Sequence, residues 1–157
     1  MVHARLGIGA ENSGKLVAKV KNEAKRIANE NSRDIILVDG SPGIGCPVVS
    51  SLSGAHFVVL VTEPTLSGLH DLKRVYQLVK KFRIRAGCII NKADLNLQVT
   101  SQIESYLKEE NITHISNLPY DETFTKSMVN GQTIIEYNDS NLTPLLTESW
   151  EKIKKLY

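Results

Sequence analysis

The chain has 157 residues, of which 41% are hydrophobic and 23% are charged, which is typical of one folded domain and excludes collagen-like, mucin-like and disordered chains. The formal net charge of +2, spread along the chain, is too small to indicate a nucleic-acid partner or a membrane surface. No apolar run approaches the roughly 20 residues that span a bilayer, and the first residues lack the apolar core of a signal peptide. We therefore expect a cytoplasmic protein with no membrane span.

Short apolar runs and amphipathic stretches alternate along the chain. In chain order they predict a helix over 16–28, strands over 35–38 and 57–61, a helix over 69–82, a strand over 88–90, a helix over 99–107, a strand over 114–118, a short helix over 122–130 and a last helix from 142. This alternation predicts an α/β fold, with a parallel sheet covered by helices on both faces. We expect one domain over residues 1–157, with the last helix packed across the sheet edge.

Two cysteines, Cys46 and Cys88, lie far apart in the sequence. Each lies in an apolar or glycine-rich segment, so we expect free, buried thiols rather than a disulfide. Iron-sulfur clusters normally need four thiolates, so the chain is predicted to hold no cluster of its own.

In an open parallel sheet, ligands bind at the carboxyl ends of the strands. The first predicted strand ends at Asp39 and is followed, up to Pro47, by a loop with three glycines and two prolines. A carboxylate can hold Mg²⁺ through water, and glycines let backbone amides approach phosphoryl oxygens, so this loop is a candidate phosphate or magnesium site. A plain tight turn is the alternative.

The next junction, residues 62–65, is as consistent with a structural role as with a functional one: Pro64 ends the strand, and Thr65 or Ser67 is a candidate cap for the following helix. The third junction, Asn91-Lys92-Ala93-Asp94, matches a pattern by which P-loop proteins hold a nucleotide base. An amide side chain offers one donor group and one acceptor in a plane, which suits a purine edge. A helix entry is its alternative.

The fourth junction, Pro119-Tyr120-Asp121, could surround the same base, and a proline turn is the alternative. Residues 9–15 fit the G-x-x-x-x-G-K string of a P-loop, but Leu16 stands where Ser or Thr would bind Mg²⁺. We favour a helix start there.

Together, residues 35–47, 57–71, 86–96 and 118–121 resemble the MinD/ParA/Mrp superfamily of P-loop ATPases, most closely the branch with an inserted ferredoxin domain and a cobyrinic acid a,c-diamide synthase-like nucleotide-binding domain. In that branch a switch loop reading Gly-Ile-Gly-Cys-Pro is followed by Val-Thr-Glu-Pro-Thr, Gly-Leu-His-Asp-Leu and Asn-Lys-Ala-Asp. The same four motifs occur in this chain at residues 43–47, 61–65, 68–72 and 91–94. The resemblance implies a Rossmann-like three-layer sandwich of the P-loop NTPase class, incomplete at the P-loop strand.

The resemblance also implies roles for single residues. Asp39 would be the Walker B type acid that positions Mg²⁺, and Gly43 would sense the γ-phosphate. Asn91 would contact adenine from a loop that includes Lys92 and Asp94, with Pro119, Tyr120 and Asp121 lining the base pocket. Family members form ATP-dependent homodimers and often act in iron-sulfur handling or spatial positioning.

The family's N-terminal strand, its Walker A loop with two lysines and its cysteine-rich insert have no counterpart in these residues. We therefore expect the C-terminal portion of a MinD-like ATPase, truncated or split, that binds ATP and Mg²⁺ weakly or not at all and is inactive without an N-terminal P-loop part or a second copy. A GTPase-like fragment is one alternative, although Pro42 stands where its D-x-x-G glycine should be, and a non-catalytic interaction module is another.

The family's P-loop strand lies between the strands that end at Asp39 and at Thr62. We expect these two strands to pair directly or to accept a strand from residues 5–9, from a second copy or from a separate N-terminal polypeptide.

Overall fold

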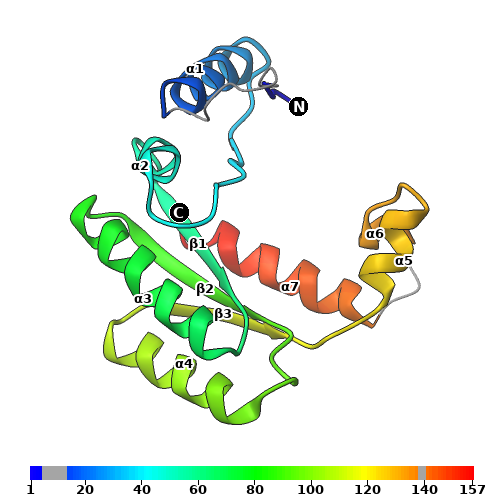
Figure 1. Ribbon diagram of the computed structural model, residues 1–157. Coiled ribbons are helices and arrows are strands. Elements are labelled where there is room, and N and C mark those ends of the chain that lie inside the picture. The colour runs from blue at the N-terminus through cyan, green and yellow to red at the C-terminus, as the bar shows by residue number, and fades with distance from the viewer. Residues whose placement is uncertain (5–13, 138–140) are drawn as a thin grey trace, which may run out of the picture.

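The computed structural model describes residues 1–4, 14–137 and 141–157. Its centre is a parallel sheet of three strands in the order β1 (Phe57–Thr62), β2 (Arg85–Asn91) and β3 (Thr113–Leu118). Because all three strands run the same way, their carboxyl ends meet at one end of the sheet (Figure 1). This confirms the predicted α/β class and the strands expected over 57–61, 88–90 and 114–118.

Helices α3 (Leu66–Lys81) and α4 (Leu97–Glu109) cover one face of the sheet, as their apolar spacing predicts (Figure 1). Their apolar sides meet the central strand in a core whose innermost members are fully buried. These are Val79, Cys88, Ile90, Ile103 and Leu107. The sheet and these two helices therefore form the main hydrophobic core.

The last helix, α7 (Leu142–Lys154), covers the opposite face and packs on β3, the edge strand, whereas a helix across the sheet edge was predicted (Figure 1). The Ser149 hydroxyl donates a hydrogen bond to the Ser116 hydroxyl over 2.7 Å. On β2 a Cβ at Gly87 would lie 2.6 Å from Cδ1 of Ile115, so a larger residue at this central position would require the Ile115 side chain to move.

Two further helices, α1 (Gly14–Glu30) and α2 (Cys46–Leu52), pack against each other. The Lys21 ammonium donates hydrogen bonds to the carbonyls of Ser50 (3.1 Å), Ser51 (2.6 Å) and Ser53 (2.7 Å) at the end of α2. These carbonyls have no helical partner, so the lysine caps α2 and ties it to α1. Partial burial, followed by repulsion from Lys25, lowers the Lys21 pKa.

The strand predicted over 35–38 does not form. Residues 35–40 have no regular secondary structure, and Ile35, Ile36, Leu37 and Val38 are 41, 40, 82 and 38% exposed. An apolar run becomes a strand only when a neighbour pairs with its backbone. Among the described residues no strand lies beside this run, and it does not pair directly with β1. The proposed partner at residues 5–9 lies outside the described residues.

Two short helices follow β3. Helix α5 (Thr123–Val129) matches the predicted one and ends at Val129; Gly131, two residues further on, has a φ of +66° that suits glycine. Helix α6 (Ile134–Tyr137), like α2, was not predicted from the sequence. The helix predicted over 16–28 is α1, described from Gly14, and the rest of the P-loop-like string, residues 9–13, lies outside the described residues.

No helix in the described part of the chain has both the length and the apolar character needed to cross a bilayer.

Candidate functional site

Three loops at the carboxyl end of the sheet are tied to one another. The Lys92 ammonium, after β2, forms an ion pair with the Glu63 carboxylate, after β1, over 2.8 Å. The backbone amide of Tyr120, after β3, donates to Oδ1 of Asp94 over 2.7 Å. The amide of Ala93 donates to the carbonyl of Leu118 over 2.9 Å. The sequence-predicted residues of the last two loops are thus brought together.

The loop after β1 is held by its own side chains. The Thr65 hydroxyl accepts a hydrogen bond from the Gly68 amide over 2.9 Å and caps α3, as predicted. The Thr62 hydroxyl donates to the Gly68 carbonyl over 3.1 Å. A Cβ at Gly68 would lie 2.3 Å from the Glu63 carbonyl oxygen, so only glycine fits against this turn. Glu63 is therefore presented to Lys92 from a closely packed turn.

The loop after β2 places Asn91 at the end of the strand, opposite Leu118 of β3. Lys92 takes a left-handed backbone conformation with φ of +54°, which is uncommon outside glycine. The buried Thr100 hydroxyl donates to the Ala93 carbonyl over 2.7 Å and holds the turn from α4. Within the described residues, the half-buried Asn91 side chain has no hydrogen-bond partner, so its amide is available to a ligand.

The cap of α4 is Asn96, whose side chain accepts from the Val99 amide over 3.1 Å. Residues 91–94 therefore do not cap the helix, which was the alternative to a base-binding role. The cap is Asn96, two positions beyond Asp94. The Asp94 carboxylate serves the loop after β3 instead, through Tyr120.

The loop after β3 presents the Tyr120 side chain, which is 50% exposed, and Pro119 is also exposed. Oδ1 of Asp121 accepts a hydrogen bond from the Thr123 amide over 2.7 Å at the start of α5. The exposed Tyr120 ring on this loop and the Asn91 amide at the end of the neighbouring strand are the two elements that a planar base needs, a stacking surface and an edge contact.

The Asp94 contact predicts a specific loss of order. Asp94→Ala removes the acceptor for the Tyr120 amide, and we expect that amide to exchange with solvent at least about tenfold faster. Asp94→Asn keeps an oxygen in place and should restore part of the protection. Amide exchange by NMR checks both, with Asp71→Ala on α3 as the matched exposed control. Unchanged exchange at Tyr120 in Asp94→Ala would show that the bond does not order the loop.

Asp39 and Gly43 lie elsewhere. Asp39 lines a hollow of about 400 Å³ together with residues 2–4, residues 36–38 and the apolar side of α1, and none of the three carboxyl-end loops lines that hollow. Gly43 has φ of +85° and no atom within 4 Å of its Cβ position, so its loop is open. In the described residues no group of three or more His, Cys, Asp or Glu side chains could hold a metal ion.

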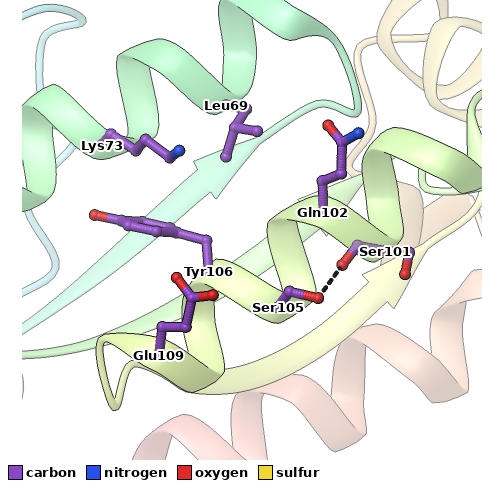
Figure 2. A pocket seen from close by; sticks show the side chains of 7 residues that line it. All are labelled: Leu69, Lys73, Ser101, Gln102, Ser105, Tyr106 and Glu109. Atoms are coloured by element: carbon purple, nitrogen blue, oxygen red, sulfur yellow. Dashed lines mark hydrogen bonds between the residues drawn. The ribbon is translucent and has the colours of Figure 1, made fainter.

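A second hollow, of about 320 Å³, lies between α3 and α4 (Figure 2). The Lys73 ammonium lies 5.1 Å from the centre of the Tyr106 ring, and Ser105 donates to the Ser101 carbonyl. Burial is the main cause that raises the pKa of Tyr106 to about 12, so its hydroxyl stays neutral. None of the residues predicted for nucleotide or metal lines this hollow.

The two thiols differ in exposure. Both are free, but Cys46 is exposed at the start of α2, which corrects the expectation that both are buried. The apolar setting of Cys46 in the sequence did not bury it because the preceding glycine-rich loop is open. Cys88 lies on the central strand, and its burial raises the pKa of the thiol from the ordinary 9.0 to about 12.

We therefore predict that one thiol per folded chain reacts with a thiol reagent at about pH 8 and that Cys46→Ser abolishes this reaction, because only the thiolate reacts. In denaturant both thiols should react, which is the control. Equal reaction of both thiols in the folded chain would contradict the burial of Cys88.

The burial of Cys88 also predicts how stability depends on pH. The Cys88 thiol ionises near 9.0 in the unfolded chain and only near 12 in the folded chain, so the free energy of unfolding should fall as pH rises between these values.

No protein-family model matches this chain. In sequence it is similar to two uncharacterized proteins of Methanocaldococcus jannaschii, MJ0578, with 27% identity over 155 residues, and MJ0579, with 31% identity over 133 residues. The matches cover 99 and 84% of this chain, and the chain spans about half the length of these curated relatives, 51 and 45%.

In structure the chain is similar to MinD proteins. The cell division ATPase MinD of Pyrococcus furiosus has a TM-score of 0.72 at 21% identity, and the match covers 92% of this chain and 60% of that one. Aquifex aeolicus MinD has a TM-score of 0.72 at 19% identity, and the match covers 91% of this chain and 61% of that one. Pyrococcus horikoshii MinD, solved in complex with Mg-ADP, has a TM-score of 0.72 at 20% identity, and the match covers 92% of this chain and 58% of that one.

These likenesses define the class of fold: the chain has the α/β fold of P-loop NTPases. More particularly, it is the fold of MinD ATPases, in agreement with the resemblance in the sequence.

The sequence alone assigns no role to Glu63, the partner of Lys92. No spacing rule relates two residues on different loops of a sheet, so only the parallel pairing of β1 and β2 brings these side chains together.

Proposed function

We propose that this chain is the C-terminal portion of a MinD-type nucleotide-binding ATPase, forming one partial nucleotide-binding domain over residues 1–157. In the complete protein it would supply two parts of the nucleotide site: the loops that hold the adenine base, and the switch loop. The observation that carries the proposal is the Asn91 amide, which is unpaired within the described residues in a loop fixed to both neighbouring loops.

In this proposal Asn91 contacts the edge of adenine. Lys92, held by Glu63, and Asp94, held against Tyr120, keep the loop in place. Pro119, Tyr120 and Asp121 form the wall of the base pocket, with the exposed Tyr120 ring beside the base. ATP is favoured over GTP because Pro42 stands where the D-x-x-G glycine of GTPases should be.

Asp39 would hold Mg²⁺, and Gly43 would respond to the γ-phosphate, in the complete protein. Both belong to a segment that here lies beside α1, so the proposal requires the region carrying the phosphate-binding loop to bring Asp39 to the carboxyl end of the sheet. The complete protein would use ATP and Mg²⁺ as a cytoplasmic homodimer, in iron-sulfur handling or spatial positioning, with no cluster bound by this chain.

The test is a calorimetric titration with Mg-ATP and Mg-GTP. It uses the chain alone and the chain mixed with the region of MJ0578 that lies outside its match to this chain. We expect ATP to bind to the mixture, and Asn91→Ala to weaken binding by at least about tenfold. Asn29→Ala, an exposed amide on α1, should bind as the unsubstituted chain does.

Tighter binding of GTP would favour the GTPase-like alternative. Binding of neither nucleotide in the mixture would favour the non-catalytic interaction module and overturn the proposal.

A further inference from the structure

The hollow of about 320 Å³ between α3 and α4 is lined mainly by polar and charged side chains and lies outside the proposed nucleotide site (Figure 2). Helix α3 contributes Leu69 and Lys73, which are one turn apart. Helix α4 contributes Ser101, Ser105 and Glu109 at successive turns, so each helix presents one face to the hollow. The volume is at the lower end of the range for ligand pockets, which suits a small ligand.

The most buried side chain in this hollow is Tyr106, and its neighbours hold its ring in place. Tyr106 is 8% exposed, and its ring meets the Tyr76 ring edge to face, with centroids 6.4 Å apart and an interplanar angle of 89°. The Tyr76 hydroxyl in turn donates a hydrogen bond to the Glu110 carbonyl over 3.0 Å. Because the ring is fixed by these contacts, the hollow does not need a ligand in order to form.

Two lysines lie two turns apart on α3, each over a tyrosine ring. The Lys80 ammonium lies 5.7 Å from the centre of the Tyr76 ring and forms an ion pair with the Glu110 carboxylate over 2.8 Å. The Lys73 ammonium lies 5.1 Å from the centre of the Tyr106 ring, but among the described residues no carboxylate pairs with it. The ring keeps this ammonium at the hollow, where an anionic group of a ligand can pair with it as Glu110 pairs with Lys80.

An opposite charge lines the same hollow. Glu109 of α4 is exposed, and in the described part of the chain no lysine or arginine forms an ion pair with it. Figure 2 shows Lys73 and Glu109 on opposite sides of Tyr106, too far apart to pair with each other. Two opposite charges that line one hollow without neutralising each other suit a ligand that itself carries both charges, which is a zwitterion.

The neutral polar groups of the hollow suit a peptide bond. The Ser105 hydroxyl donates its hydrogen to the Ser101 carbonyl over 2.9 Å, so towards a ligand it can only accept. The exposed Gln102 side chain offers an amide donor as well as an acceptor. A peptide group carries one N–H donor and one C=O acceptor, and the hollow offers a partner for each.

We propose that the hollow between α3 and α4 binds a dipeptide in its zwitterionic form, with the terminal carboxylate on Lys73 and the terminal ammonium on Glu109. Leu69 lies one turn before Lys73 on α3, so the residue that carries the carboxylate would bring an aliphatic side chain to it. A dipeptide is favoured over a free amino acid because the two protein charges are not adjacent, and a second residue lengthens the ligand by about 3.5 Å. This inference goes beyond the proposed function, since no nucleotide is involved.

Titration of the whole chain with glycyl-leucine, followed by amide chemical shifts in NMR, tests the inference. We expect an affinity in the millimolar range, because both protein charges are exposed and exposed ion pairs are weak. The shifts should saturate below about 20 mM and should appear at residues 69–73 and 101–109 and not at residues 91–94 or 119–121.

Two variants and two blocked peptides assign the ends of the ligand. Lys73→Gln and Glu109→Gln change exposed side chains, so both should fold, and each should weaken binding of glycyl-leucine by about two- to fivefold. Acetyl-glycyl-leucine lacks the ammonium and should be insensitive to Glu109→Gln, whereas glycyl-leucinamide lacks the carboxylate and should be insensitive to Lys73→Gln. Lys81→Gln on α3 and Glu148→Gln on α7, both exposed and outside the hollow, should bind as the unsubstituted chain does.

Four outcomes would overturn the inference. The first is the absence of saturable shifts at residues 69–73 and 101–109. The second is binding of leucine as tightly as glycyl-leucine, which would identify a free amino acid as the ligand. The third is binding of acetyl-glycyl-leucine as tightly as glycyl-leucine, which would leave only an anion site at Lys73. The fourth is a pair of glutamine variants that bind every peptide as the unsubstituted chain does.

Discussion

Replacing Ile90 with alanine is expected to lower the free energy of unfolding by about 3 kcal/mol. Ile90 has no exposed surface and lies on β2, the central strand, within the core formed with α3 and α4. The variant loses the transfer free energy of the removed groups and gains a cavity that the two neighbouring strands prevent from closing. In a domain whose total stability is about 5–15 kcal/mol, this is a large fraction.

Urea unfolding followed by circular dichroism measures the loss as a lower midpoint with an unchanged slope. The matched control is Ile135→Ala on α6, where the side chain is 48% exposed, and we expect a loss below about 1 kcal/mol. Equal losses in the two variants would mean that Ile90 is not enclosed as described.

ATP turnover by the chain alone is expected to be indistinguishable from that of a blank without protein. Phosphoryl transfer depends on cationic and backbone donors around the β- and γ-phosphates, and each such donor typically accounts for about a hundredfold or more in rate. The carboxyl-end loops include one lysine, Lys92, which is paired with Glu63, and Asp39 lies apart from them beside α1. Release of inorganic phosphate with Mg-ATP is the measurement.

Asp39→Ala provides the control for this measurement. Turnover that requires Mg²⁺ and disappears in Asp39→Ala would contradict the expectation, and would point to a phosphate site that includes residues 9–15. Turnover that persists in Asp39→Ala at the same rate would instead indicate a contaminating ATPase.

Local patterns predicted the elements that bury their own apolar residues. Strands β1, β2 and β3 and helices α3 and α4 were all predicted from β-branched runs or helical spacing, because each of them buries apolar side chains. Residues 35–38 have the same composition, but pairing with a neighbour decides whether such a run becomes a strand, and composition carries no information on the neighbour. Helix α2 was missed because its first turn reads as a glycine-proline loop, although Pro47 suits that position.

The sequence predicted which residues lie at the candidate site, but not which of their side chains contact one another. The rule that ligands bind at the carboxyl ends of parallel strands selected the loops with Asn91, Asp94 and Tyr120. In the structure the two loops are joined by the hydrogen bond from the Tyr120 amide to Asp94. The same rule selected Asp39, which lies elsewhere, because the rule assumes that the strand before it is part of the sheet. The Lys92–Glu63 pair arises only from the register of β1 with β2.

A lysine of α7 bears on how copies of this chain can associate, because the Lys152 ammonium donates hydrogen bonds to the carbonyls of His114 and Ile115 in the edge strand β3. A sheet with two open edges can add copies at both ends and grow into a fibre, whereas a sheet with one open edge can join only one other copy through it. A strand of another copy that needed these carbonyls would have to displace Lys152 from them. Lys152→Ala is therefore expected to make β3 a better partner for a strand of another copy.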